Sequence, residues 1–443
     1  MRMNRRFGRL AALLALALLC GCTPAPGAAQ PTPQPELPAT ETPALSGPAE
    51  PAPTAAPAQE QTPAPEPAPE EADPVAALLQ QMTLREKVGQ LFMIRPDSLD
   101  LTLPQEEIDD EYANGVTALS DAMRKTLQDY PVGGICQFGK NITGPQQIAQ
   151  FNADLQAASK IPLLISVDEE GGAVARLANH PAFDLPRYES AAAIGETGDP
   201  EAAREMGATI GAYLKDYGFT MDFAPDADVY TNPANAVIGT RAFSQDAATA
   251  ATMAGAMAQG LQAQGILPTL KHFPGHGDTA EDSHSGLART DRTLAEMRGC
   301  EFLPFRLTEN GFDPERLPAV MVGHIAAPAL GDGDAPASLS YRLVTEVLRG
   351  EVLEGAPVLV VTDSLSMGAV TERYGPGQAA VRALQAGCDV LLMPAGLAEA
   401  FDAVVAAVED GTIPAARLDE SVARVLRAKQ LYAGLELPQE GEG

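Results

Sequence analysis

Residues 247–273 read AATAATMAGAMAQGLQAQGILPTLKHF, and this stretch decides the fold. Its first part, Ala247–Gln264, has the apolar spacing of a helix, and the apolar run Ile266–Phe273 that follows has the length of a buried strand. A helix that leads directly into a buried strand is the repeating unit of a parallel sheet. We therefore expect the same alternation on both sides of this stretch.

Outward from this stretch, strand and helix patterns alternate from about residue 75 to residue 435. Eight apolar runs predict strands: Val88–Ile94, Val132–Phe138, Pro162–Asp168, Phe219–Val229, Ile266–Phe273, Ala319–Ile325, Val358–Asp363 and Asp389–Met393. The helical segments include Pro145–Lys160, Pro200–Tyr217, Ala247–Gln264, Tyr341–Leu353 and Pro414–Leu431. This α/β pattern predicts a (β/α)8 TIM-like barrel. A doubly wound open sheet is the alternative, although no glycine-rich dinucleotide fingerprint follows the first strand.

The ends of the predicted strands carry polar side chains, which are Asp168, Asp226, Lys271, His272, His324 and Asp363. In a barrel, the carboxyl ends of the strands meet at one pocket. Structural ion pairs would account for one or two such groups, but burying six polar groups is costly unless they bind something. The pattern therefore predicts a polar site at the barrel mouth.

The charge balance narrows the possible partners. The chain has 30 Lys and Arg against 59 Asp and Glu, a net charge of −29, which argues against nucleic acid as a partner. With 45% hydrophobic residues, it has enough apolar side chains for a folded core. Cys136, Cys300 and Cys388 are too far apart in sequence for a metal knuckle or a disulfide framework, so we expect free thiols, with one disulfide as the alternative.

The N-terminus has the pattern of a targeting sequence. Four arginines precede the apolar run Leu10–Leu19, as in a secretory signal. The following Leu19-Cys20-Gly21-Cys22 resembles a bacterial lipobox, which predicts lipidation of Cys22, anchoring to the bacterial cell membrane and an extracytoplasmic location. An ordinary cleaved signal peptide is the alternative.

A proline-rich tether is expected to follow the signal. Residues 22–74 hold 16 of the 38 prolines and neither Lys, Arg nor aromatic residues, so they cannot bury a core. We expect residues 1–21 to be the signal, 22–74 a disordered tether, 75–435 the barrel and 436–443 a tail.

The run Lys271–His284 concentrates reactive side chains, because it holds three of the five histidines. A zinc site is one reading, but the HExxH spacing is absent and Pro274 and Gly275 interrupt the His272–His276 interval, so we predict no metal. Asp282 and His284 are two residues apart, so the carboxylate can orient the imidazole for proton transfer. Alone, this pair is also compatible with a surface hydrogen bond.

Taken with other blocks, this run resembles glycoside hydrolase family 3, in its β-N-acetylglucosaminidase branch. The blocks are Met82–Met93, Val167–Leu177, Ile238–Phe243, Lys271–His284, Val320–Ile325 and Val361–Ala369, which together cover roughly residues 78–432. The resemblance implies a catalytic barrel, and because few residues follow Leu431 we expect it to stand without the C-terminal α/β sandwich domain that many members have. It differs from the usual pattern at Glu169 and Ala173, where Gln and Arg are common, and at Ala288, where Pro is common.

The resemblance also implies roles for individual residues. Asp363 matches the nucleophile, His284 the acid/base and Asp282 its dyad partner. Residues that grip the terminal sugar match Asp168, Arg176, Arg241, Lys271 and His272. Glu169 and Glu170 are interpreted as carboxylates of a loop.

The implied function is retaining, exo-acting hydrolysis of terminal β-linked N-acetylglucosamine from aminosugar glycans such as peptidoglycan fragments, by a monomer without cofactor. Three alternatives remain open: a β-N-acetylglucosaminide phosphorylase, a β-glucosidase of the same family, and an inactive glycan-binding lipoprotein. Residues 97–130 form a long acidic excursion between two predicted strands, and no role is implied for them.

Overall fold

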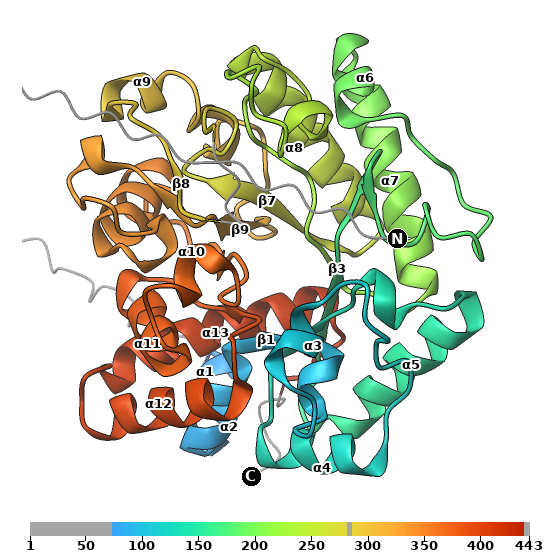
Figure 1. The fold of residues 1–443 in the computed structure, drawn as a ribbon, viewed down its shortest axis with the longest axis vertical. Coiled ribbons are helices and arrows are strands. Elements are labelled where there is room, and N and C mark those ends of the chain that lie inside the picture. Colours follow the sequence, from blue (N-terminus) through green and yellow to red (C-terminus); the bar gives the residue numbers. More distant parts are fainter. Residues whose placement is uncertain (1–72, 281–285, 438–443) are drawn as a thin grey trace, which may run out of the picture. The chain divides into compact units, whose positions relative to one another are not determined.

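The computed structural model describes residues 73–280 and 286–437, and the elements below belong to these residues (Figure 1). Cys22, the predicted signal and the predicted tether up to residue 72 fall outside them, as do Asp282 and His284. The last two residues of the predicted tether, Asp73 and Pro74, instead cap and begin α1 (Pro74–Gln81). None of the helices in the described residues has both the length and the apolar character needed to cross a bilayer.

Eight parallel strands form a nearly closed barrel. They are β1 (Phe92–Ile94), β2 (Gly134–Cys136), β3 (Leu164–Val167), β6 (Met221–Asp222), β7 (Leu267–Phe273), β9 (Ala319–Val322), β11 (Val360–Thr362) and β12 (Leu391–Leu392). From β1 to β11 each strand pairs with the next one in this order, and β12 pairs with β1. A parallel bridge between Val361 and Val390 joins β11 to the β12 segment and completes the ring. The predicted barrel is confirmed, and the open-sheet alternative is wrong.

Helices lie around the strands (Figure 1). The longer ones are α4 (Asp121–Asp129), α5 (Pro145–Ala158), α7 (Pro200–Asp216), α8 (Ala247–Ala263), η7 (Arg342–Val352), α11 (Pro376–Ala386), α12 (Leu397–Glu409) and α13 (Ala415–Tyr432). The shorter ones are α1 (Pro74–Gln81), α2 (Leu84–Gln90), α3 (Gln105–Asp109), α6 (Ala191–Glu196), α9 (Leu294–Arg298) and α10 (Gly368–Thr371). Two pairs of short strands lie outside the barrel sheet: β4 (Glu169–Gly171) with β5 (Val174–Ala175), and β8 (Ala288–Arg289) with β10 (Ile325–Ala326).

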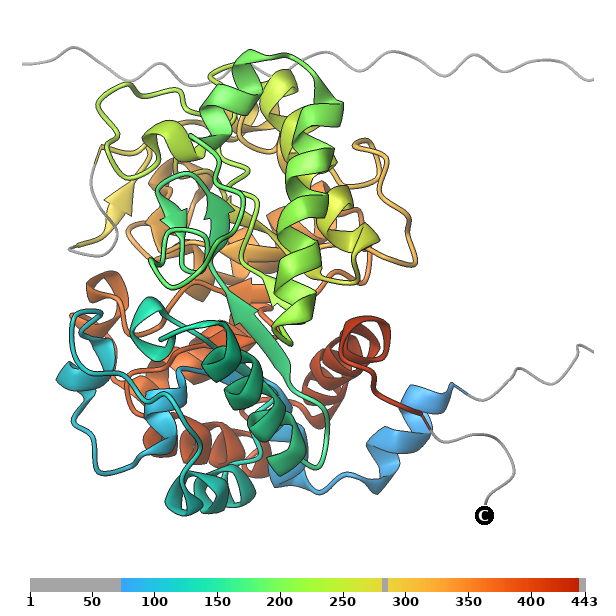
Figure 2. The ribbon, with the colours of Figure 1, turned by 90° about the vertical axis from the view of Figure 1, so that its right-hand side faces the viewer.

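The helices α7 and α8 lie side by side, as Figure 1 and Figure 2 both show. Glycines allow this close contact: a Cβ atom on Gly207 would lie 2.0 Å from the carbonyl oxygen of Met257, and one on Gly260 would lie 2.2 Å from that of Arg204. Such distances are far below van der Waals contact, so only glycine fits at either position.

The observed strands are shorter than most of the predicted runs, and one predicted run overlaps a helix. The run Val88–Ile94 begins inside α2, and β1 starts at Phe92. The reason is local: the Thr83 side chain accepts from the backbone N–H of Glu86, and the Glu86 carboxylate accepts from the N–H of Thr83. This capping box starts a helix just before the apolar residues.

The cysteines Cys136, Cys300 and Cys388 are free thiols. Cys136 and Cys388 are buried, and Cys300 is half-buried. The expectation of free thiols is confirmed, and the disulfide alternative is wrong.

Candidate active site

A cavity of about 670 Å³ opens at the carboxyl ends of the barrel strands. Every strand contributes to its wall at or near its carboxyl end, through Arg95, Phe138, Asp168, Phe223, Lys271, Met321, Asp363 and Leu392. The six sugar-site and nucleophile residues predicted within the described chain, Asp168, Arg176, Arg241, Lys271, His272 and Asp363, all line this cavity. The fold thus brings together residues that are far apart in the sequence: Asp168 and Asp363 are separated by 195 positions.

A chain of alternating charges forms the inner part of the cavity. Lys271 Nζ lies 2.7 Å from Asp168 Oδ1 and 2.6 Å from Glu170 Oε1. The Arg241 guanidinium donates to both Glu170 oxygens, at 2.8 Å each. Each buried charge therefore has a partner of opposite sign, which fixes the direction of its side chain.

These ion pairs hold the groups in their charged forms. Burial alone would raise the pKa of Glu170, but Arg241 and Lys271 outweigh it and lower the pKa. Burial likewise acts against the charge on Lys271, yet Asp168 and Glu170 raise its pKa. A neutral, hydroxyl-rich ligand would meet fixed donors and fixed acceptors in this part of the cavity.

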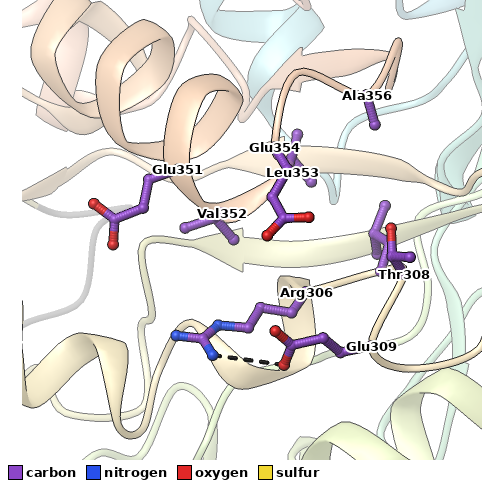
Figure 3. Close-up of a pocket in the computed structure, with 9 residues that line it drawn as sticks. Arg306, Thr308, Glu309, Glu351, Val352, Leu353, Glu354 and Ala356 are labelled. Atoms are coloured by element: carbon purple, nitrogen blue, oxygen red, sulfur yellow. Dashed lines mark ion pairs between the residues drawn. The ribbon is translucent and has the colours of Figure 1, made fainter. Parts of the chain in front are cut away.

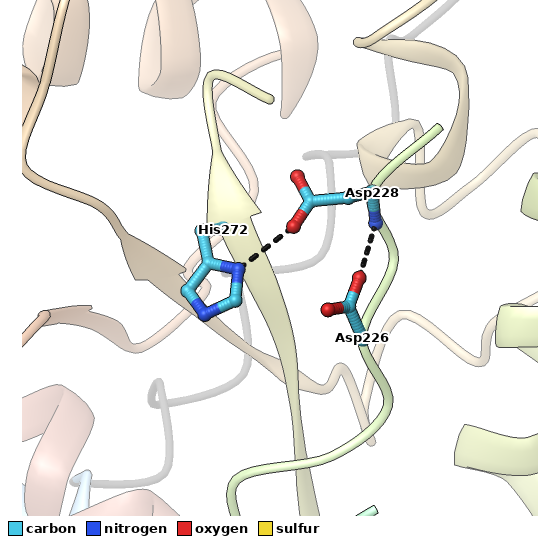
Figure 4. A group of neighbouring side chains, drawn as sticks. All are labelled: Asp226, Asp228 and His272. Carbon is cyan, nitrogen blue, oxygen red and sulfur yellow. Dashed lines mark hydrogen bonds and ion pairs between the residues drawn. The ribbon is translucent and has the colours of Figure 1, made fainter. Parts of the chain in front are cut away.

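His272 is oriented by a carboxylate behind it (Figure 4). Its Nδ1 lies 2.7 Å from Asp228 Oδ2, and its other ring nitrogen points away from Asp228. Burial opposes a charged ring, but Asp228 outweighs it and raises the pKa of His272. The same contact lowers the pKa of Asp228 despite its burial. His272 thus carries a proton on Nδ1 and presents Nε2 as the second polar atom of the ring.

Asp226, Asp228 and His272 also form the one group in the described chain with the residue types and spacing of a metal site, with ligand atoms within 4.8 Å of one another (Figure 4). The donor atoms already have other partners. Asp228 binds Nδ1 of His272, the backbone N–H of Asp228 donates to Asp226 at 3.0 Å, and Arg241 Nε lies 3.4 Å from Asp226 Oδ2. The guanidinium would repel a cation, so we interpret the group as a hydrogen-bonded cluster.

Asp363 follows β11 directly, so the barrel itself places its carboxylate. Its backbone N–H donates to the carbonyl oxygen of Val322 at 2.9 Å, which continues the β9–β11 pairing. Its Oδ1 accepts from the N–H of Ser364 at 2.7 Å. The carboxylate therefore stands on a rigid strand end, in the same cavity as Lys271 and His272.

Asp282 and His284 lie outside the described residues, but the segment that leads to them is held firmly. The N–H of His276 donates to Asp228 at 2.5 Å, and its ring contacts Thr279 Oγ1 at 2.8 Å. Asn235 donates to the carbonyl oxygen of His276 at 2.7 Å, and a Cβ atom on Gly277 would lie 2.0 Å from the carbonyl oxygen of Val229. His276 also lines the cavity.

The two glutamates after Asp168 differ from the sequence interpretation, because they lie on β4 and not in a loop. Successive residues of a strand point to opposite sides. Glu169 is accordingly turned into the core, where it accepts from the N–H groups of Leu177 and Ala178 and from the Tyr213 hydroxyl, all at 2.8 Å. Glu170 lies on the cavity side. Sequence reasoning missed this difference, although the alternation of a short strand would have indicated it.

Sequence reasoning also missed residues that line the cavity or stand behind its wall. Asp228 stands behind His272, and the sequence pattern instead points to Asp226, two positions earlier, as the polar strand end. Asp109, Glu111 and Tyr112 come from the acidic excursion, for which the sequence implied no role. His324 is buried and hydrogen-bonded to Ser338 and to the carbonyl oxygen of Ser364, both at 2.7 Å, and it supports the Asp363 segment from behind.

A second, smaller cavity of about 230 Å³ lies between residues 306–309 and the end of η7 (Figure 3). Arg306 and Glu309 in its wall are an ion pair at 3.5 Å. It contains none of the groups at the strand ends, so the larger cavity is the candidate active site.

Taken together, the fold and the cavity define a parallel-barrel protein with a carboxylate and a network of fixed charges at its mouth. Residues 83–428 match the model of the glycosyl hydrolase family 3 N-terminal domain. The chain therefore belongs to glycoside hydrolase family 3, and the resemblance read from its motifs is confirmed.

Individual relatives agree with this assignment. The chain is 36% identical over 343 residues to β-hexosaminidase LpqI of Mycobacterium tuberculosis, which covers 74% of this chain and 83% of LpqI. It is 31% identical to β-hexosaminidase A of Pseudoalteromonas piscicida, over 71% of this chain and 56% of that protein. The chain thus spans little more than half the length of that relative.

Solved structures give the same result. A family 3 β-N-acetylglucosaminidase from Paenibacillus sp. FPU-7 superposes with a TM-score of 0.70 at 37% identity, over 82% of this chain and 65% of that one. The structure of M. tuberculosis LpqI superposes with a TM-score of 0.68 at 34% identity, over 82% of this chain and 98% of that one.

Proposed function

We propose that this protein is a retaining, exo-acting β-N-acetylhexosaminidase that removes terminal β-linked N-acetylglucosamine from glycans such as peptidoglycan fragments. The observation that carries the proposal is the placement of Asp363 on a strand end in the cavity that also holds Asp168, Lys271 and His272. The names of the relatives support the aminosugar.

In this proposal, the sugar lies among the fixed charges, with Asp168 accepting hydrogen bonds from its hydroxyls and Lys271, His272 and Arg176 donating to them. The Asp363 carboxylate attacks the anomeric carbon while His284, held by Asp282, protonates the departing oxygen. The bond between the sugar and the leaving group breaks, and a glycosyl ester of Asp363 forms. His284 then takes a proton from water, which releases the sugar with retention.

A leaving-group series tests the reaction. Wild-type protein should hydrolyse p-nitrophenyl β-N-acetylglucosaminide faster than the β-glucoside, and NMR should show the β-anomer as first product.

Asp363→Ala should abolish turnover without changing the unfolding transition. His284→Ala should reduce turnover of poor leaving groups more than of good ones, because only poor leaving groups need a proton.

Each alternative has its own outcome in the same experiment. Formation of N-acetylglucosamine 1-phosphate in phosphate buffer would identify a phosphorylase, and faster turnover of the glucoside would identify a β-glucosidase. Binding of N-acetylglucosamine without turnover of any activated glycoside would identify an inactive binding protein.

We also propose that the protein is a monomer tethered outside the cytoplasm by a lipid on Cys22, on the basis of the lipobox-like Leu19-Cys20-Gly21-Cys22. Metabolic labelling with a fatty acid tests the anchor. Label should enter the wild type and be lost in Cys22→Ala, and label retained in that variant would contradict the proposal.

A further inference from the structure

The acidic excursion reaches the candidate active site. The turn η1 (Pro96–Leu99) follows β1, and α3 comes next, close to the end of β1 (Figure 1). Asp109, Glu111 and Tyr112, at the end of α3 and just after it, line the same cavity as Asp363. A segment that the family resemblance leaves unexplained thus forms part of the wall.

The barrel holds this segment by its backbone. The carbonyl oxygen of Ile108 accepts from Arg95 Nη1 at 2.7 Å and from Lys140 Nζ at 2.8 Å, and Lys140 also donates to the carbonyl oxygen of Glu107 at 2.9 Å. Arg95 directly follows β1 and lines the cavity, and Lys140 lies four residues after the end of β2. Two cations therefore fix the backbone immediately before the lining residues.

A buried carboxylate fixes the other side of the excursion. Asp97 accepts from the N–H of Val116 at 3.1 Å and from Asn141 Nδ2 at 2.7 Å, and its Oδ1 lies 3.6 Å from Lys140 Nζ. Because the chain is bound both before residue 109 and at residue 116, the residues between them are presented at a defined place on the rim.

The exposed fraction of the lining side chains increases from the floor of the cavity to its rim. The side chain of Lys271 is 4% exposed, that of Asp168 18%, that of Arg176 29% and that of Glu111 47%, and Tyr112 is 99% exposed. Glu111 lies 3.6 Å from Arg176, so the rim meets the sugar-gripping residues directly. A glycan whose terminal sugar fills the floor must extend past this rim.

We propose that residues 109–112 form the subsite for the leaving group, with the Tyr112 ring as a stacking platform for the pyranose that carries the scissile oxygen. This inference rests on the proposed function. A fully exposed aromatic ring on a fixed rim offers a flat apolar surface beside a polar pocket, and the C–H face of a pyranose matches it. The substrate class is therefore a glycan at least two sugars long, and not a glycoside with a compact alkyl group.

The test compares two substrates with aliphatic leaving groups, the disaccharide GlcNAc-β-1,4-GlcNAc and methyl β-N-acetylglucosaminide. Only the disaccharide has a ring to place on Tyr112. Tyr112→Ala should lower the ratio of kcat/KM for the disaccharide to kcat/KM for the methyl glycoside about tenfold. Tyr112→Phe, which keeps the ring, should restore the ratio to within about twofold of the wild type.

Tyr341→Ala serves as the matched control, because Tyr341 is also an exposed tyrosine but lines a different cavity, and it should leave the ratio unchanged. An unchanged ratio in Tyr112→Ala, or an equal loss on both substrates, would overturn the leaving-group subsite while leaving the proposed function in place. If the wild type hydrolyses neither substrate nor the activated glycosides, the proposed function fails and the subsite fails with it.

Discussion

Asp228 does not line the cavity, but it fixes the orientation and raises the pKa of His272, which does. Its carboxylate holds His272 Nδ1 at 2.7 Å and raises the pKa of that ring against the effect of burial. Hydrogen bonds to charged groups contribute about 1.5–3 kcal/mol. Asp228 therefore positions His272, and its effect on the reaction must pass through the imidazole.

We accordingly expect Asp228→Asn to lower the pKa of His272 and to reduce kcat/KM roughly 10- to 100-fold. The measurement is an NMR titration of the histidine ring protons together with the pH profile of kcat/KM. Asp313→Asn, at a surface carboxylate, is the control. A loss of activity with an unchanged His272 titration would show that Asp228 has only a structural role.

Asp226 gives a prediction about pH and stability. Burial and the neighbouring Asp228 raise the pKa of Asp226 to about 7, whereas an aspartate in the unfolded chain titrates near 4. Between these two values the folded protein keeps a proton that the unfolded chain has lost. The contribution of Asp226 to stability is therefore present below about pH 4 and falls as pH rises through 7, by up to about 1.4 kcal/mol per pH unit.

Asp226→Asn removes this titration, so the free energy of unfolding of the variant should improve relative to the wild type between pH 4.5 and pH 7.5. Urea unfolding of both proteins at the two pH values measures the change. Glu315→Gln, at an exposed carboxylate, should show no such trend. A difference between Asp226→Asn and the wild type that stays constant with pH would refute the prediction.

At the scale of elements, the contact of α7 with α8 depends on glycine. A methyl group at residue 260 would lie 2.2 Å from the Arg204 carbonyl oxygen, which belongs to backbone and cannot rotate away. We expect Gly260→Ala to destabilise the protein by about 1–3 kcal/mol, the usual cost of overpacking. Thermal unfolding measures it.

Gly299→Ala is the control for this prediction, because a Cβ atom there would have no neighbour closer than 3.6 Å and the residue has an ordinary helical conformation. It should change stability little. Equal effects of the two substitutions would mean that the close contact of α7 and α8 contributes nothing.

The elements also show what sequence could predict. Each of the eight apolar runs contains a barrel strand, because a strand buried on both faces leaves a continuous apolar pattern. The pattern cannot mark where a strand begins when a capping box precedes it, as Thr83 and Glu86 do before β1. Part of the site could be predicted in the same way, because Asp168, Lys271 and Asp363 lie at the ends of predicted strands. The contribution of Glu111 and Tyr112 could not be predicted. It depends on long-range contacts of Arg95 and Lys140 with the backbone of residue 108, which leave no signal in the local sequence.

At the scale of the whole barrel, one buried carboxylate joins three elements close to the place where the ring of strands closes. Asp389 accepts from the N–H of Val360 at 3.0 Å and pairs with Arg349 at 2.5 Å and Arg424 at 3.0 Å. It thus joins the β11 strand, the η7 helix and the α13 helix at the place where the ring of strands meets. Burial opposes its charge, but these arginines outweigh burial and lower the pKa of Asp389.

We expect Asp389→Ala to destabilise the barrel by about 3–5 kcal/mol, because it leaves half-buried arginines without their buried partner. Since the pKa of Asp389 is lowered in the folded state, its contribution is present above about pH 4 and is lost as pH falls below that value. Chemical unfolding at pH 7 measures the loss. Glu409→Ala, at an exposed carboxylate, should be neutral, and a neutral Asp389→Ala would show that the seam closes without it.

The pairing of β1 with β12 has a further consequence for how the protein is made. Phe92 of β1 lies beside Leu391 of β12, so nearly 300 residues of sequence separate two strands that must pair. While residues 300–390 are still being added during synthesis, the strands already made form a sheet with two unpaired edges. Unpaired sheet edges can pair with other chains. The barrel can close only after β12 has been synthesised, so both outer strands stay unpaired until then.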